Sequence, residues 1–218
     1  GDGGETVPAP GWWKGIYIYD GGSATLDNCV VRYGGHSHSW DSHNTRANIL
    51  KVGAGDLTVT NSIISHNSND GIRLENTTGT VTINDNDFIA NQRDGISSDN
   101  STPVISGNKV SNNSRYGLFV NGYNSPSNVS GNILSGNSVD IYLTVSGSGT
   151  LIGSNTFTGP IYVGNGTIAE NISWGSDYPY YLTGWVTVGS DAVLTIPAGR
   201  VVKFAQGASL TVNGTLDA

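Results

Sequence analysis

The sequence predicts an all-β chain that coils into a parallel β-solenoid with about 22–25 residues per coil. Three observations lead to this fold class. The composition disfavours long helices, apolar anchor residues recur at a constant interval, and asparagines recur at the same interval. Repeats of this length indicate one supersecondary unit per repeat, stacked on its neighbours.

The composition favours short strands joined by tight turns. Gly accounts for 31 of the 218 residues, and Asn, Ser and Thr are abundant. Such residues are weak helix formers and strong turn formers. The net charge of −7 argues against nucleic acid or an anionic membrane surface as a partner. The single cysteine, Cys29, excludes an intrachain disulfide framework, and no apolar run is long enough to cross a bilayer.

The apolar anchors follow short turns. The stretches DGIRL, DGISS, YGLFV and VDIYL place their anchors at a nearly constant step, and a further anchor lies one step earlier, in ANILKV. These anchors are Ile49, Ile72, Ile96, Leu118 and Ile141. Each unit is too short to bury a face alone, so stacking of equivalent strands about 4.8 Å apart would pack each anchor on the next.

The asparagines form two further series with the same period. The first is Asn61, Asn86, Asn108, Asn132 and Asn155, with an apolar residue two positions after each; Asn28 and Val30 fit the same template. These apolar residues are Ile63, Phe88, Val110, Leu134 and Phe157. The second series is Asn67, Asn91, Asn113 and Asn137. We expect both series to form structural ladders of side-chain amides along the stack.

Coils of the form GI-x-ϕ … GN-x-ϕ resemble the right-handed single-stranded parallel β-helix of the pectin-lyase-like superfamily, over residues 11–170. The resemblance implies the fold. It does not imply one function, because this fold hosts lyases, hydrolases, epimerases, adhesins and inert stalks.

The pattern changes after Trp174. The segments YLTGWVTV, LTIPAGRVVKF and LTVNGTLDA resemble the opening coils of bacterial and archaeal surface β-helix modules. We therefore expect residues 1–174 to form β-helix coils with a loop insertion at 34–46, and residues 175–218 to open a following module. The resemblance implies one period of a tandem array, whose open ends would stack head to tail as a filament.

Catalytic residues of β-helix polysaccharide enzymes cannot be placed in this chain. The resemblance to polygalacturonases would require an adjacent pair of aspartates, which the sequence lacks, and Gly35-His36-Ser37 matches their Gly-His-Gly only in part. The clustered carboxylates and catalytic arginine of pectate lyases cannot be matched either. We assign no catalytic residue and no required cofactor.

A carboxylate stripe follows from the repeat. Asp70 and Asp94 share one turn position, and Glu75 and Asp99 share another. Stacked carboxylates would lie about 5 Å apart, a spacing that suits Ca²⁺ or a catalytic pair. Arg73, Arg93 and Arg115 are close in sequence, so a solvated, neutralised turn face is the alternative that we expect.

A histidine-rich loop is the second candidate site. The interval from Ile16 to Ile49 is longer than the regular step between anchors, so an insertion falls within 34–46. It carries His36, His38, Asp41 and His43, and register places His66 one coil from the root of the loop. These side chains could bind Zn²⁺ or Cu²⁺. A polar loop without a metal is the alternative.

Aromatic residues and sequons suggest roles at surfaces. The first coil concentrates Trp12, Trp13, Tyr17, Tyr19, Tyr33 and Trp40, and Trp12, Trp13 and Trp185 are the candidate assembly residues. Such rings stack on sugars or cover an interface, and we favour the interface. The N-glycosylation sequons are Asn76, Asn100, Asn112, Asn128, Asn165, Asn171 and Asn213.

These observations favour a structural or adhesive extracellular or cell-surface module that associates with itself head to tail and has glycans as candidate ligands. A polysaccharide lyase, a polysaccharide hydrolase or a sugar-binding module on the same fold is the alternative. A Thr-x-Thr array typical of ice-binding solenoids is interrupted, because TVT at 58–60 and TVTI at 80–83 are followed by PVIS.

Overall fold

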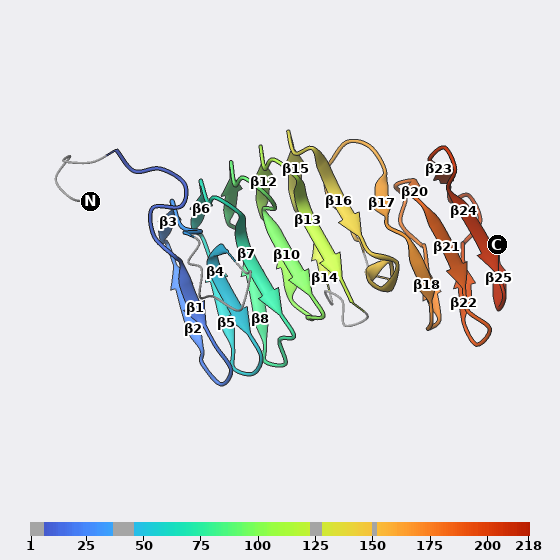
Figure 1. Cartoon of the computed structure of the whole chain (residues 1–218), viewed down its shortest axis with the longest axis horizontal. Coiled ribbons are helices and arrows are strands. Elements are labelled where there is room, and N and C mark those ends of the chain that lie inside the picture. Colours follow the sequence, from blue (N-terminus) through green and yellow to red (C-terminus); the bar gives the residue numbers. More distant parts are fainter. Residues whose placement is uncertain (1–6, 37–45, 123–127, 150–151) are drawn as a thin grey trace.

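The computed structural model describes residues 7–36, 46–122, 128–149 and 152–218. They form an elongated rod of stacked coils, with β1–β3 at one end of the rod and β23–β25 at the other (Figure 1). All strand pairs between named strands in the described residues are parallel, in five sheets that we call A to E. The predicted parallel β-solenoid is therefore confirmed. No helix of the described residues is long and apolar enough to cross a membrane.

Sheet A runs along the whole rod. In the described chain its strands are β1 (Ile16–Ile18), β4 (Ala47–Val52), β7 (Asp70–Glu75), β10 (Ile96–Asp99), β13 (Tyr116–Asn121), β16 (Val139–Leu143), β17 (Ile161–Val163), β20 (Tyr180–Leu182) and β23 (Val202–Phe204), in that order.

Sheets B and C complete the N-terminal coils. Sheet B has the order β14-β11-β8-β5-β2, with β2 (Ala24–Asp27), β5 (Leu57–Thr60), β8 (Val81–Asn84), β11 (Val104–Ser106) and β14 (Asn128–Ser130). Sheet C has the order β15-β12-β9-β6-β3, with β3 (Val30–Arg32), β6 (Ile63–Ser65), β9 (Asp87–Ile89), β12 (Lys109–Ser111) and β15 (Ile133–Ser135).

Sheets D and E complete the C-terminal coils. Sheet D has the order β18-β21-β24, with β18 (Gly166–Ile168), β21 (Trp185–Val188) and β24 (Ser209–Val212). Sheet E has the order β19-β22-β25, with β19 (Ile172–Ser173), β22 (Val193–Thr195) and β25 (Thr215–Asp217).

The anchor series predicted from the sequence forms the inner wall of sheet A. Ile49 pairs with Ile72, Ile72 with Ile96, Ile96 with Leu118, and Leu118 with Ile141. All five side chains are buried in one continuous core. Because every coil contributes inward side chains to the same column, the core extends along the axis instead of closing around a centre.

The first asparagine ladder is confirmed from Asn86 onward and wrong in the first two coils. Asn86, Asn108, Asn132 and Asn155 are buried and linked by amide hydrogen bonds of 2.9–3.0 Å. In the earlier coils Cys29 and Ser62 hold the equivalent position, and Asn28 and Asn61 lie one residue before it, in the turn.

The shift by one residue exchanges the inner and outer faces. Ile64 is buried and Ile63 is 39% exposed, whereas the asparagine template had placed Ile63 inside. Likewise Val31 is buried and Val30 is 60% exposed. Side chains alternate between the two faces of a strand, so a register error of one residue reverses every assignment on it.

The turn before the ladder requires left-handed backbone. Asn28, Asn61 and Asp85 have φ of 53°, 50° and 56°, and Gly107 and Gly131 take the same position at 67°. Asn, Asp and Gly tolerate this region best. Asparagine therefore suits two successive positions, the left-handed turn residue and the ladder residue after it. This explains why the sequence pattern assigned Asn28 and Asn61 to the ladder, one residue too early.

The second asparagine series forms a ladder as predicted. The backbone N–H groups of Asn67, Asn91 and Asn113 each donate to the side-chain oxygen of the next asparagine, at 3.0–3.1 Å. The series ends at Asn137, whose amide donates to Asp140. Both ladders satisfy buried polar groups at the corners of the coil, except at the start of the second ladder, where the side-chain nitrogen of Asn67 is buried without a partner.

The strand pairing around the expected insertion is regular. Ile16 pairs directly with Ile49 despite the longer interval between them in the sequence, and β3 ends at Arg32 before β4 begins at Ala47. Residues 37–45, with His38, Trp40, Asp41 and His43, lie outside the described part of the chain.

A discontinuity separates the two groups of sheets. Sheets B and C end at β14 and β15. In the described residues these two strands pair with the next coil only through isolated β-bridges, at Ile152 and Thr156. A short 3₁₀ helix, η1 (Val145–Gly147), occupies the turn. Sheet A crosses this junction without a break, and residues 175–218 stack on it through β17 and β20. That residues 175–218 belong to a separate module stays a prediction.

Candidate functional site

The carboxylate stripe lies at both ends of two neighbouring strands: Asp70 begins β7 and Asp94 lies just before β10, while Glu75 and Asp99 end these strands. Asp70 and Asp94 are both buried, and one Asp70 carboxylate oxygen accepts the backbone N–H of Asp94 at 3.2 Å. Asp99 pairs with Glu75 across the same two strands. The repeat therefore stacks equivalent carboxylates of successive coils, but the expected solvated turn face is wrong for Asp70 and Asp94, because both side chains are buried.

Arginines surround the buried carboxylates. Arg73 lies 3.4 Å from Asp70 and 2.6 Å from Glu75, and Arg93 lies 3.3 Å from Asp70. Arg115 binds Asp94 through two guanidinium nitrogens, at 2.8 and 2.5 Å. A Ca²⁺ ion would have to displace these arginines. No group of three His, Cys, Asp or Glu side chains among the described residues is arranged to hold a metal.

Burial changes the titration of this cluster. Desolvation, and next to it the neighbouring Asp94 charge, raises the pKa of Asp70 from 3.8 to about 6, although Arg93 and Arg73 oppose the shift. For Arg73, hydrogen bonding to Glu75 and the nearby carboxylates outweigh burial, and its pKa rises. The cluster is thus a neutralised ion-pair network with one carboxyl that titrates in a mildly acidic range.

An aromatic surface on the outer face of sheet A adjoins this network. The Tyr116 ring stacks on Tyr142 with centroids 4.6 Å apart, and Phe119 lies 6.0 Å from Tyr142. The Arg115 guanidinium lies 4.4 Å from the Tyr116 ring centroid. This contact ties the aromatic group to the carboxylate network, since Arg115 also binds Asp94.

Register extends the aromatic surface along the rod. Phe119 pairs with Tyr142, Tyr142 with Tyr162, and Tyr162 with Tyr181. We call these four residues, with Tyr116, the aromatic ribbon; all are half-buried. The sequence reasoning missed the ribbon. Its signal was present, because Phe119 and Tyr142 each follow an inward anchor by one residue and must point outward.

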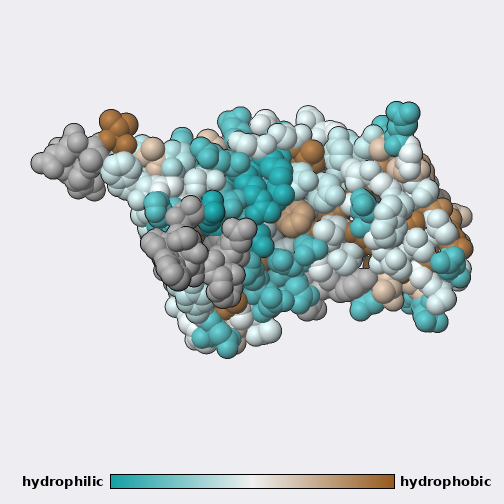
Figure 2. Space-filling model, in the orientation of Figure 1, coloured by the Kyte–Doolittle hydropathy of each residue, from teal (hydrophilic) through white to brown (hydrophobic). Residues whose placement is uncertain are grey.

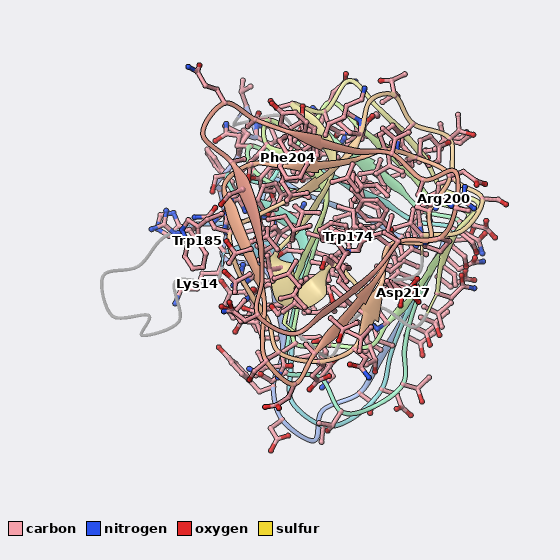
Figure 3. The ribbon with its side chains drawn as sticks, turned by 90° about the vertical axis from the view of Figure 1, so that its right-hand side faces the viewer. Lys14, Trp174, Trp185, Arg200, Phe204 and Asp217 are labelled. Atoms are coloured by element: carbon pink, nitrogen blue, oxygen red, sulfur yellow. The ribbon has the colours of Figure 1, made fainter. Side chains whose placement is uncertain are left out.

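The tryptophans proposed for assembly lie near the two ends of the rod. Trp12 is 55% and Trp185 54% exposed, while Trp13 donates its ring N–H to the Arg32 carbonyl at 2.7 Å. Viewed along the rod from its C-terminal end, Trp185 lies at the edge of the cross-section and Trp174 inside it (Figure 3). The structure does not bring Trp12 and Trp185 together within one chain.

Two of the four histidines lie in described residues. His36 is within 2.9 Å of the Gly11 carbonyl through Nδ1. The His66 ring is 5.6 Å from the Tyr33 ring, at the root of the insertion, where the register predicted it. The zinc or copper proposal also needs His38, Asp41 and His43, which lie outside the described residues, and it stays a prediction.

The sequon asparagines are accessible. Asn76, Asn112, Asn128, Asn165, Asn171 and Asn213 are exposed and Asn100 is half-buried. Asn76 and Asn100 occupy equivalent turns, and the Asn100 amide donates to Asn76 at 2.9 Å. Attachment of glycans at these positions stays a prediction.

Two shallow grooves lie on the outer surface. One, of about 510 Å³, is lined by the turns before β9 and β12 and includes Asp85, Asp87 and Lys109. The other, of about 460 Å³, lies at the junction and includes Asn155, Tyr178 and Arg200, which is paired with Asp177. Neither groove includes the Asp70 network or the aromatic ribbon.

Comparison with known proteins identifies the family of the fold. A family model described as a right handed beta helix region matches residues 10–157. That range spans the coils with asparagine ladders and ends at the junction. The comparisons with curated proteins and with solved structures return no match to this chain.

Proposed function

The chain belongs to the right-handed β-helix family, and we propose that it serves as a structural, rod-forming module of an extracellular or cell-surface fibre. The observation that carries this proposal is sheet A, whose nine strands in the described residues form one uninterrupted sheet along the axis of the rod. Carboxylates that are occupied by arginines support it further.

The last coil is built like an interior coil. Phe204, Val212 and Leu216 occupy the inward positions, since they pair with the buried Leu182, Val188 and Leu194. Phe204, Val212 and Leu216 are nevertheless 47%, 42% and 39% exposed, while their partners are fully buried. Figure 2 shows hydrophobic atoms gathered at this end of the rod.

The last coil thus repeats the inward pattern of the interior coils, and the core keeps one format along the axis. Burial of apolar surface is worth roughly 25 cal/mol per Å², and each interior coil gains it on both sides. Stacked coils of one format give a rod, which is the shape that a fibre module requires.

The proposal also accounts for the carboxylate stripe. An enzyme of this fold needs carboxylates that are free to act on substrate. Here Asp94 binds Arg115, and Asp70 lies within 3.4 Å of two arginines. The ion pairs Arg93–Asp70 and Arg115–Asp94 instead link successive coils along the axis. The exposed sequons are compatible with an extracellular location.

Immunogold electron microscopy of the source material tests the role. An antibody against the purified chain should decorate thin fibres outside the cell, with a width of one rod. Labelling of dispersed soluble material, or of the cell interior, would contradict a structural role in a surface fibre.

The aromatic ribbon favours a second candidate function, binding of a polysaccharide along sheet A. Tyr142, Tyr162 and Tyr181 lie on successive coils, so a linear glycan could stack along the rod. A glycan array tests this function. Tyr142→Ala should abolish a hit that the wild type gives, while Tyr19→Ala, an exposed tyrosine of the first coil, should not; equal losses would discard the ribbon as the site.

A further inference from the structure

We propose that the groove at the junction binds a sugar that carries an acetamido group, such as an N-acetylhexosamine unit of a glycan. This junction groove lies between residues 152–155 and residues 175–178, with Arg200 beside them, and has a volume of about 460 Å³. Ligand sites commonly measure about 300–1,000 Å³. The site is separate from the aromatic ribbon, and the proposal goes beyond the role of the chain in a fibre.

The groove arises where the format of the coils changes. In the described residues, the segments 152–155 and 175–178 are not joined by strand pairing. They meet instead through Tyr178, whose ring stacks on Phe157 with centroids 3.8 Å apart and whose hydroxyl donates to the Asn155 carbonyl at 2.6 Å. Because a side chain and not a strand ladder sets their separation, the two segments leave a groove between them.

Asn155 supplies a hydrogen-bond donor to this groove. In the earlier rungs of the first ladder, the backbone N–H of Asn86, Asn108 and Asn132 each donates to the side-chain oxygen of the next asparagine, at 3.0 Å. The ladder ends at Asn155, and the Asn155 N–H has no hydrogen-bond partner among the described residues. By the geometry of the ladder this N–H points along the axis, toward residues 175–178. A buried N–H without a partner is costly, and an amide oxygen from a ligand would replace the missing rung.

An exposed ion pair supplies donors and acceptors for hydroxyl groups. Arg200 binds Asp177 through Nη1, and the two side chains are 29% and 87% exposed. Figure 3 shows Arg200 at the edge of the cross-section of the rod. A guanidinium has several N–H donors and a carboxylate has several acceptor positions, so this pair keeps capacity for further hydrogen bonds. Neighbouring sugar hydroxyls, which both donate and accept, match such a pair.

Tyr178 adds an apolar surface between these polar groups. It is half-buried, lines the groove, and has Phe157 against one face of its ring. Aromatic rings pack well against the C–H faces of sugars and against methyl groups. A plain hexose would leave the Asn155 N–H without an amide oxygen, and an amide side chain of a peptide would leave Asp177 and Arg200 unused. An acetamido sugar matches all three features of the groove.

Titration of the ¹⁵N-labelled chain with N,N′-diacetylchitobiose, followed by amide NMR shifts, tests the proposal. The Asn155 amide and amides of residues 175–178 should shift and saturate at millimolar sugar. Cellobiose is the matched probe, because it has the same linkage and lacks the acetamido groups. It should bind about tenfold more weakly, as expected when a buried donor is left without its acceptor.

Two variants change the groove from different sides, after circular dichroism has shown that each is folded. Gly175→Leu places a side chain where Gly175 lines the groove, and a Cβ there would meet only Ser173 Oγ, at 3.7 Å; binding should be lost. Arg200→Ala removes donors for the hydroxyls and should weaken binding several-fold. Lys109→Ala, which removes a positive charge from the other groove, is the control and should bind like the wild type.

Three results would overturn the proposal: no shift of the Asn155 amide at saturating sugar, equal binding of cellobiose, or unchanged binding by Gly175→Leu. Shifts confined to the outer face of sheet A would assign the sugar to the aromatic ribbon and overturn the junction groove as its site. If Gly175→Leu fails to fold, Asp177→Ala combined with Arg200→Ala takes its place, and binding as in the wild type would again contradict the proposal.

Discussion

Asn108 shows how one residue holds three successive coils together. Its side-chain nitrogen donates to Asn132 Oδ1 and to the Ile83 carbonyl, both at 2.9 Å. Its side-chain oxygen accepts from the backbone and side-chain nitrogens of Asn86, both at 3.0 Å. The side chain is fully buried, so water cannot replace these partners if it is removed.

Asn108→Ala should therefore lower the free energy of unfolding by about 2–4 kcal/mol, since each buried polar group left without a partner costs about 1–3 kcal/mol. Chemical denaturation monitored by circular dichroism measures the loss. Asn128→Ala, at an exposed position of β14, is the control and should change stability by less than about 0.5 kcal/mol. Equal effects would show that the ladder contributes nothing specific.

Asp70 makes the stability of the molecule depend on pH. Its pKa is about 6 in the folded chain against an ordinary 3.8, chiefly because burial disfavours the charged carboxylate. The folded state thus keeps this proton to higher pH than the unfolded state does. The contribution of Asp70 to the free energy of unfolding is therefore greatest below about pH 4 and is lost as the pH rises to about 6.

The variant Asp70→Asn should remove that dependence. Between pH 4 and pH 7 the free energy of unfolding of the wild type should fall by roughly 1–3 kcal/mol relative to that of the variant, as expected for a shift of about two pKa units. Urea titrations at both pH values measure the difference. Asp191→Asn, in an exposed turn, controls for the loss of one charge, and a parallel change there would refute the assignment to Asp70.

At the scale of the elements, the junction after β16 depends on aromatic packing. Sheets B and C are not hydrogen-bonded to sheets D and E in the described chain, and buried rings fill the space between them. Trp174 stacks on Tyr180 with centroids 5.2 Å apart and donates to Ser148 at 3.1 Å. Phe157 stacks on Tyr178 at 3.8 Å, and the Tyr178 hydroxyl donates to the Asn155 carbonyl at 2.6 Å.

Trp174→Ala should consequently weaken the coupling between the two parts of the rod. Truncation of a buried Trp costs about 3–5 kcal/mol, and in stacked-coil proteins such a loss at one interface can split unfolding into two steps. Hydrogen exchange should then protect β21 less than β8. Trp185→Ala, at a 54% exposed position, should leave a single transition; a single transition in both variants would mean that sheet A alone couples the parts.

The regular coils were predictable because one constraint repeats in each of them. Inward anchors such as Ile72 and Ile96 keep the same interval wherever the wall is continuous. The register failed at Asn61, where asparagine serves the left-handed turn and Ser62 serves the ladder. One residue type with two physical roles at adjacent positions cannot be separated by spacing alone.

Part of the candidate site was also predictable from the repeat: the positions of the carboxylates, but not their partners. Periodicity placed Asp70 beside Asp94, but it could not show that Arg115 would bind Asp94, because side-chain direction depends on the packed neighbours. The aromatic ribbon follows from strand alternation and was within reach of the sequence. The discontinuity at the junction was not, since the ladder ends at Asn155 while sheet A continues.

At the scale of the whole molecule, sheet A joins all the described coils into one stack. Sheets B and C end at β14 and β15, and sheets D and E begin at β18 and β19, so in the described residues sheet A alone crosses the junction. Inward side chains from both parts belong to one core. Because every coil adds to the same sheet and the same core, the rod is held together along its axis in spite of the break in its other faces.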